Sequence, residues 1–221
     1  MIHFISIQNT YNTLEIGFFK GDQLVDWLTE DKISASKNCV PLMQDLLVKN
    51  GASLSSLAFI AVNQGPGPFT TLRVVISTVN GLSFANNIPL IGVDALDALL
   101  TEYQQADYPL TIALLNAFNN DVYFGIQNGE AEFEKGYKNI DKFLEEISHK
   151  FPNETVRFIG NGAALFVSQI THKLGSRAHI PDSLPNTATI QQIGLLGLEL
   201  WKANETGSKQ LQPLYLKTVL I

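Results

Sequence analysis

The chain has 221 residues, of which 45% are hydrophobic and 16% are charged, and it contains one cysteine. This balance excludes intrinsic disorder, because a chain this long and this apolar can bury a large core. Its 15 basic and 21 acidic residues give a net charge of −6, which disfavours tight direct binding to nucleic acid. A single cysteine excludes an intramolecular disulfide and a four-cysteine zinc site. The amino terminus has no signal-peptide pattern and no apolar run reaches a membrane-spanning length, so we expect a soluble cytoplasmic protein.

The first hundred residues predict a strand-rich unit that ends in alternating strands and helices. Segments that are apolar on one or both faces predict strands, and apolar residues three and four apart predict helices. The strands are expected at 2–7, 14–19, 23–28, 57–62 and 89–93, and the helices at 36–49, 69–86 and 94–103. The first strand is apolar on both sides, so we expect both of its faces to be buried.

The second half repeats this order. Strands are expected at 110–115, 121–127, 131–137, 155–159 and 178–180, and helices at 140–150, 163–173 and 189–203. Asn128-Gly129 indicates a hairpin between the second and third of these strands. The tail 211–221 is apolar and rich in strand-forming residues, and we expect it to pack back on the first lobe. Two βββαβα units predict an α/β protein of two actin-like lobes, residues 1–104 and 105–221, each a mixed five-stranded sheet flanked by helices.

Proteins of the actin, Hsp70 and sugar-kinase fold that transfer phosphate need a carboxylate after the first strand of each lobe, to hold Mg²⁺ or to orient water. Here these turns read Gln8-Asn9-Thr10 and Asn116-Ala117-Phe118-Asn119-Asn120. The first acid after the second turn is Asp121. The sequence therefore disfavours ATP hydrolysis by this chain alone, and it predicts no metal site.

The loop Gln64–Thr70 opens the long helix and has two interpretations. A helix amino terminus can bind an anion such as phosphate. The alternative is a stiff turn between strand and helix, which we favour because Pro66 and Pro68 lack the N–H groups that a phosphate needs. The four histidines have no ligand spacing, and Cys39 lacks the basic surroundings of a reactive thiol. We therefore predict no catalytic residue and no cofactor.

The helices 36–49 and 69–86 are apolar on more than one side, whereas a surface helix normally shows one stripe. In the second helix, Leu72, Ile76, Val79 and Ser83 form a stripe suited to a sheet. The first helix carries Cys39, Val40, Leu42, Met43, Leu46, Leu47 and Val48. Small uncharged residues form a further stripe of the second helix, Val74, Thr78, Gly81 and Ala85. These extra faces indicate either a surface for a partner or burial inside this chain, and the pattern alone leaves both open.

The segment Gly65-Pro66-Gly67-Pro68-Phe69-Thr70-Thr71-Leu72-Arg73 resembles the G-P-G-S-F-T-G-L-R signature of the TsaB (YeaZ) family. Similarity continues through most of the chain. It includes Gly81–Ala85, Ile88–Val93, Asp121-Val122-Tyr123, Gly160–Ala163 and Pro213–Lys217.

The resemblance implies a non-catalytic scaffold subunit of the machinery that places a threonylcarbamoyl group on N6 of adenosine 37 in tRNAs reading A-starting codons. It implies pairing with the catalytic subunit TsaD through the first two helices, joining by the ATPase TsaE, and homodimers through the same surface in isolation. Transfer RNA would be held through the partners. The interface would contain Leu42, Met43, Leu46, Val74, Thr78, Gly81 and Ala85. The signature loop would contain Gly65, Pro66, Gly67, Phe69, Thr70 and Arg73.

The chain departs from the family pattern at several positions. Gln8 stands where the family has Asp, Pro68 replaces Ser, and Thr71 replaces Gly. Asn116-Ala117-Phe118 replaces a D-A-R stretch, and Ala35-Ser36-Lys37 replaces an H-S-E-like stretch. Most of these changes remove a charged or nucleotide-compatible group, which fits a scaffold. The alternatives are a glycoprotease-like peptidase, which needs a metal or nucleophile site, and a small-molecule kinase of the same fold.

Overall fold

The computed structural model describes residues 2–31, 34–129, 133–203 and 207–217. The chain forms two compact units, each built around its own five-stranded sheet. Unit 1 comprises Met1–Ala95 and Thr189–Leu214, and unit 2 comprises Leu96–Ala188 and Tyr215–Ile221.

Unit 1 has the strand order β3-β2-β1-β4-β5. Strand β1 is antiparallel to β2 and parallel to β4, so the sheet is mixed, as predicted. The strands are β1 (His3–Asn9), β2 (Thr13–Lys20), β3 (Gln23–Asp31), β4 (Phe59–Gly65) and β5 (Leu90–Asp94), and the helices are α1 (Ala35–Lys49), α2 (Phe69–Asn86), α7 (Ile190–Ala203) and the 3₁₀ helix η1 (Leu54–Ser56).

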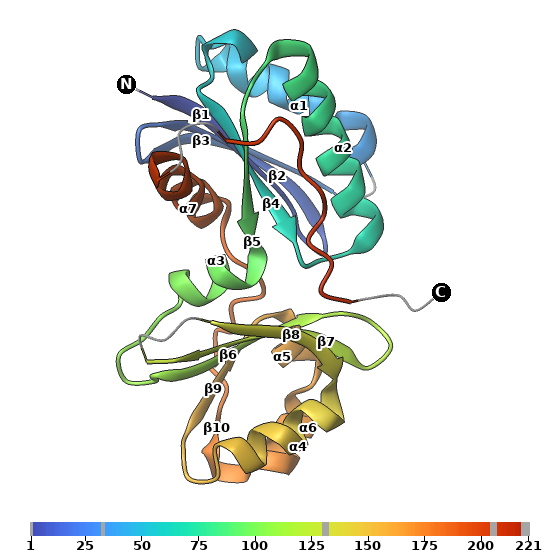
Figure 1. The fold of residues 1–221 in the computed structure, drawn as a ribbon, viewed down its shortest axis with the longest axis vertical. Helices are drawn as coiled ribbons and strands as arrows, with labels where there is room; N and C mark the ends of the chain where they lie inside the picture. The colour runs from blue at the N-terminus through green and yellow to red at the C-terminus, as the bar shows by residue number, and fades with distance from the viewer. Residues whose placement is uncertain (1, 32–33, 130–132, 204–206, 218–221) are drawn as a thin grey trace. The chain divides into compact units, whose positions relative to one another are not determined.

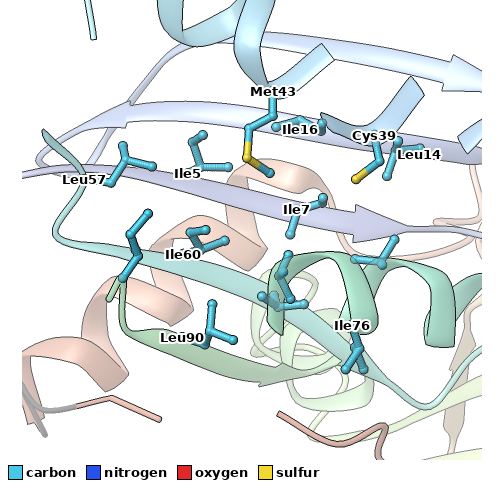
Figure 2. Close-up of a cluster of buried hydrophobic side chains, with 14 of the residues drawn as sticks. Ile5, Ile7, Leu14, Ile16, Cys39, Met43, Leu57, Ile60, Ile76 and Leu90 are labelled. Atoms are coloured by element: carbon cyan, nitrogen blue, oxygen red, sulfur yellow. The ribbon is translucent and has the colours of Figure 1, made fainter. Parts of the chain in front are cut away.

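Helices cover both faces of this sheet, with α1 and α2 on one side and α7 on the other (Figure 1). Alternate residues of β1 lie on the two faces of the sheet, because successive side chains of a strand point in opposite directions. Ile5 and Ile7 lie in the core beneath α1 and α2, together with Met43 and Cys39 (Figure 2). Phe4 lies on the α7 face. The prediction of a first strand buried on both faces is confirmed.

Aromatic rings fill the α7 face of the sheet. Phe4 stacks on Phe19 and on Phe59, with ring centroids 4.6 and 4.4 Å apart, and Trp201 of α7 stacks on Phe59 at 5.0 Å. Ser6 Oγ donates a hydrogen bond to the carbonyl of Ile190 at the start of α7. Helix α7 packs on these rings and therefore belongs to unit 1. In the sequence it is separated from the first part of unit 1 by 93 residues of unit 2.

Unit 2 repeats the design, with the strand order β10-β9-β6-β7-β8. Strand β6 is antiparallel to β7 and parallel to β9. The strands are β6 (Leu110–Asn116), β7 (Asp121–Asn128), β8 (Glu134–Asn139), β9 (Val156–Ile159) and β10 (Ala178–His179), and the helices are α3 (Ala95–Glu102), α4 (Ile140–Lys150), α5 (Asn161–Leu165), α6 (Val167–Leu174) and the 3₁₀ helix η2 (Gly175–Arg177).

Three details differ from the sequence-based expectations. The helix expected at 163–173 is two helices, because Phe166, buried in the core of unit 2, adopts φ −112° and ψ 25° and interrupts the helix. The tail forms no strand between residues 207 and 217, where its one ladder contact is an isolated bridge between Ser208 and Leu90. The expected boundary at residue 104 also differs from the observed division, in which unit 2 begins at Leu96 and α7 belongs to unit 1.

Candidate functional site

The outward sides of α1 and α2 form one surface of unit 1, named here the α1–α2 surface. The two helices pack against each other and against the same sheet face. Between Val74 and Ala85 the sequence of α2 has no charged residue. The surface is defined by the exposed or partly exposed residues Val40, Leu42, Gln44, Val48, Val74, Thr78, Gly81, Phe84 and Ala85.

The structure places the predicted interface residues in two groups. Those of α2 reach the surface: Val74 and Thr78 are partly exposed, and Gly81 and Ala85 are exposed. Of the three predicted residues in α1, Leu42 alone is partly exposed. Met43 and Leu46 are 1% and 0% exposed and lie in the core, so the prediction that they lie on a partner-facing side of α1 is wrong. They face the sheet because they share a helix stripe with Cys39 and Leu47.

Three exposed apolar side chains of this surface were absent from the predicted set. Phe84 is 89% exposed, Val48 is 70% exposed and Val40 is 44% exposed. The sequence pattern placed Val40 and Val48 among the apolar residues of their helix without assigning them to an exposed or a buried side. The position of Phe84 could have been found from spacing, because it lies three residues after Gly81 and so shares the outward side of α2.

An apolar hollow of about 400 Å³ opens between α1, the segment after it and the end of α2. Met43 and Leu47 line it from the core side, and Leu82 and Asn86 line it from α2. Exposed apolar patches next to a concavity are typical of protein-binding surfaces. The hollow therefore extends the α1–α2 surface.

Asp26 of β3 fixes the end of α1. Its Oδ2 accepts hydrogen bonds from Lys49 Nζ at 2.8 Å and from Asn50 Nδ2 at 3.1 Å. The hydrogen bond from Lys49 is the largest effect on this carboxyl group, and it holds the pKa of Asp26 below its usual value. A cation near a helix carboxyl terminus also favours the helix dipole.

The signature loop leads directly into α2. Gly65 adopts φ +101°, its N–H donates to Asn63 Oδ1 at 2.9 Å, and the Gly65–Pro66 peptide is cis. A β-carbon at Gly65 would lie 2.8 Å from Leu72, so this position favours glycine for two reasons. Gly65 and Pro66 are buried, and Gly67 is partly exposed. The conformation of Gly65, its hydrogen bond to Asn63 and the burial of Gly65 and Pro66 support the interpretation of the loop as a structural turn.

The first turn of α2 presents Phe69, Thr70 and Arg73 at the surface. The Arg73 guanidinium lies 3.7 Å from the centroid of the Phe69 ring. This is a cation–π contact, which is weak at exposed positions. The structure thus brings together the two largest residues of the predicted loop set.

Gln8, near the end of β1, is fully buried and bonded within unit 1. Its amide donates to Glu15 Oε2 at 2.8 Å and accepts from Asn63 Nδ2 at 3.2 Å. Asn63 in turn holds the N–H of Gly65. Gln8 therefore supports the signature loop through a chain of polar contacts.

The corresponding turn of unit 2 is also used internally. Asn116 Oδ1 accepts from the N–H of Phe118, and its own N–H donates to Asn161 Oδ1. Asp121, the first acid after this turn, accepts hydrogen bonds at Oδ2 from Tyr137 at 2.6 Å and Lys217 at 3.0 Å. Burial alone would raise the pKa of Asp121, but these two donors outweigh it and lower that pKa. Asp121 is thus an anchor for Tyr137 and Lys217.

In the described part of the chain, no three side chains among His, Cys, Asp and Glu gather as ligands for a metal ion. No helix there is long and apolar enough to cross a membrane.

Comparison with known proteins gives consistent matches. Residues 33–206 match a family model described as TsaD, tRNA N6-adenosine threonylcarbamoyltransferase. The chain is 25% identical over 219 residues to the tRNA threonylcarbamoyladenosine biosynthesis protein TsaB of Bacillus subtilis, covering 96% of this chain and 93% of that protein. It is 26% identical to the TsaB of Haemophilus influenzae over 82% of this chain and 79% of that protein.

Solved structures show the same fold. YeaZ from Pseudomonas aeruginosa superposes with a TM-score of 0.74 and 23% identity, over 98% of this chain and 100% of that one. Its likeness extends over both units and confirms the expected architecture, as two mixed five-stranded sheets also do.

Proposed function

Because the chain belongs to the TsaD family and is a TsaB relative in tRNA threonylcarbamoyladenosine biosynthesis, we propose that it is the non-catalytic subunit that binds TsaD through the α1–α2 surface. The observation that carries this proposal is the nearly uncharged outward side of α2, with Phe84 89% exposed beside the small residues Gly81 and Ala85. Small residues allow another helix to approach closely, and an exposed aromatic ring is typical of a binding hot spot.

Two observations support a role without catalysis. The turn residues Gln8 and Asn116 are amides, and both are engaged in hydrogen bonds inside their own unit. An amide brings no charge to a Mg²⁺ ion, whereas phosphoryl transfer depends on carboxylates to hold the metal. We therefore assign the threonylcarbamoyl transfer to the partner.

The remaining partners follow from the same proposal. TsaE would join the pair with TsaD, and in isolation the chain would form homodimers through the α1–α2 surface. Binding of TsaD would then dissociate the homodimer, because both need the same residues. Transfer RNA would be held mainly by the partners, since the net charge of this chain is −6.

The test is binding to the TsaD of the same organism, measured by calorimetry and size-exclusion chromatography, with Gly81→Arg as the disruptive variant. A β-carbon at Gly81 meets no atom within 4 Å, so the free protein accommodates the change. The matched control is Leu200→Arg, which puts the same charge on exposed α7, on the other side of the sheet.

We expect Gly81→Arg to weaken binding by tenfold or more, roughly the effect of losing a hot spot, while Leu200→Arg binds like wild type. Wild-type affinity of Gly81→Arg would contradict the proposed surface. An absence of binding by the wild type would contradict the proposed partner. The kinase and peptidase alternatives each predict turnover by the pure chain, with ATP and a small molecule or with a peptide.

A further inference from the structure

The last segment of the chain lies along α2, the helix of the proposed interface. Asn80 of α2 bonds both backbone groups of Leu211, accepting from its N–H and donating to its carbonyl, each at 2.9 Å. Ser83 Oγ donates to the carbonyl of Lys209 at 3.2 Å. Figure 1 shows this segment running beside α2. We name residues 207–217 the C-terminal strap.

The strap also holds the end of β4, immediately before the signature loop. The backbone carbonyl of Gln64 accepts a hydrogen bond from the N–H of Leu214 at 2.8 Å. The side-chain amide of Gln64 donates a hydrogen bond to the carbonyl of Gln212. The Gln64 side chain occupies space that only glycine at position 92 leaves open, because a β-carbon there would lie 1.8 Å from Gln64 Oε1. The strap is therefore bonded at both the loop and the helix that the loop begins.

The far end of the strap is anchored in unit 2. The chain passes from unit 1 to unit 2 between Leu214 and Tyr215. Lys217 Nζ then lies 3.0 Å from Asp121 Oδ2, which also accepts from Tyr137, and 4.8 Å from the centroid of the Tyr137 ring. The side chains of Lys217 and Asp121 are 28% and 15% exposed. Because the pair is partly buried, it contributes more to stability than an ordinary ion pair at the surface.

We infer that the C-terminal strap is a positioning element for the interface, and that Lys217 is the residue that holds it in place. Asn80 and Ser83 alternate along α2 with the outward residues Thr78, Gly81 and Phe84. Because the strap is hydrogen-bonded to Asn80 and Ser83, it limits how far α2 can shift or fray. Releasing Lys217 loosens the strap and lowers affinity for the partner, although Lys217 lies outside the α1–α2 surface. This inference rests on the proposed function for the identity of the partner.

The test uses the full chain and the variant Lys217→Met, which keeps the aliphatic stem and removes the charge. Lys217→Arg should restore the anchor. The matched control is Lys150→Met, which breaks the surface pair with Glu134 in the same unit and leaves the strap untouched. Two quantities are measured, amide hydrogen exchange of residues 74–85 and 207–214, and affinity for TsaD.

We expect Lys217→Met to speed exchange in both segments by about threefold or more and to weaken TsaD binding by roughly fivefold. Lys150→Met should leave both unchanged. Wild-type exchange in Lys217→Met overturns the inference, and so does faster exchange with unchanged affinity. If the wild-type chain fails to bind TsaD, the proposed function is contradicted, and the exchange measurement alone still decides whether Lys217 positions α2.

Discussion

Gly194 of α7 lies directly on Phe19 of β2, so that a β-carbon at position 194 would come within 2.2 Å of the Phe19 ring. This close approach lets α7 settle on the stacked rings of Phe4, Phe19 and Phe59. The contact therefore depends on the absence of a side chain at one position of the helix.

Gly194→Ala should destabilise the protein despite the better helix propensity of alanine. Overpacking a filled site costs about 1–3 kcal/mol, which exceeds the roughly 1 kcal/mol that a helix gains from replacing glycine with alanine. Thermal unfolding measures the difference. The matched control is Gly81→Ala, where the new methyl group meets nothing within 4 Å and stability should rise or stay unchanged. Equal stability of the two variants would contradict the packing described for α7.

The two sides of α1 should respond differently to truncation. Leu46 is fully buried, and Leu46→Ala is expected to lower the free energy of unfolding by about 2–5 kcal/mol. Val48 is 70% exposed, and Val48→Ala should change the free energy of unfolding by less than about 0.5 kcal/mol. Denaturant unfolding of both variants checks the assignment. A large loss of stability in Val48→Ala would show that this face is buried in the isolated protein.

Cys39 should be unreactive in the folded protein. Its side chain is 1% exposed, and burial raises the pKa of its thiol to about 11. Because the thiolate is the reactive form, a chromogenic disulfide reagent at pH 8 should label no thiol in native protein and one thiol per chain in guanidinium chloride. Rapid labelling of the native protein would show that α1 opens readily.

The anchor of the C-terminal strap should depend on pH in a defined way. Burial raises the pKa of Asp121, but the hydrogen bonds from Tyr137 and Lys217 together outweigh it, so that this pKa is lower than that of an ordinary aspartate. A carboxyl group with a lowered pKa stabilises the fold above its unfolded-state value, and this contribution is lost as the pH falls further. Burial is likewise outweighed at Lys217, whose pKa is raised above 10.5, so its contribution is lost only in strong alkali.

Wild type and Lys217→Met should therefore differ most in melting temperature between about pH 4 and pH 10, by an amount that corresponds to about 1 kcal/mol. The difference should shrink as the pH falls below 3.8. Melting curves from pH 3 to pH 8 measure it. A difference that stays constant over this range would exclude Asp121 as the partner of Lys217.

Much of the fold could be predicted from local patterns. Apolar residues on both faces of β1 indicated a strand covered on two sides, and Asn128-Gly129 indicated the hairpin between β7 and β8. The affiliation of α7 could not be predicted in this way. Its packing depends on Gly194 meeting Phe19, which is 175 residues away, and no local pattern records such a contact.

The candidate site was predictable in part for the same reason. The spacing of residues along α2 assigned Leu72 and Val79 to one stripe and Gly81 and Ala85 to another. In the structure the first two are buried and the last two are exposed. In α1 almost every side is apolar, so the pattern could not distinguish buried Met43 from exposed Val48. Only the position of the sheet decides which of these residues faces inward. The strap was visible only as an apolar tail, because its bonds to Asn80 and Gln64 join distant parts of the sequence.

The discontinuity of unit 1 has a consequence for synthesis on the ribosome. Residues 1–95 leave the ribosome first, but the helix that covers Phe4, Phe19 and Phe59 begins at residue 190. At roughly 5–20 residues per second, translation of residues 96–188 leaves this aromatic face uncovered for about 5–20 s. During that time residues 96–188, the main part of unit 2, can fold from a continuous stretch of chain, while the nascent amino-terminal sheet exposes apolar surface of the kind that chaperones bind. A stop codon before α7 would consequently harm the first-made unit more than the last-made one.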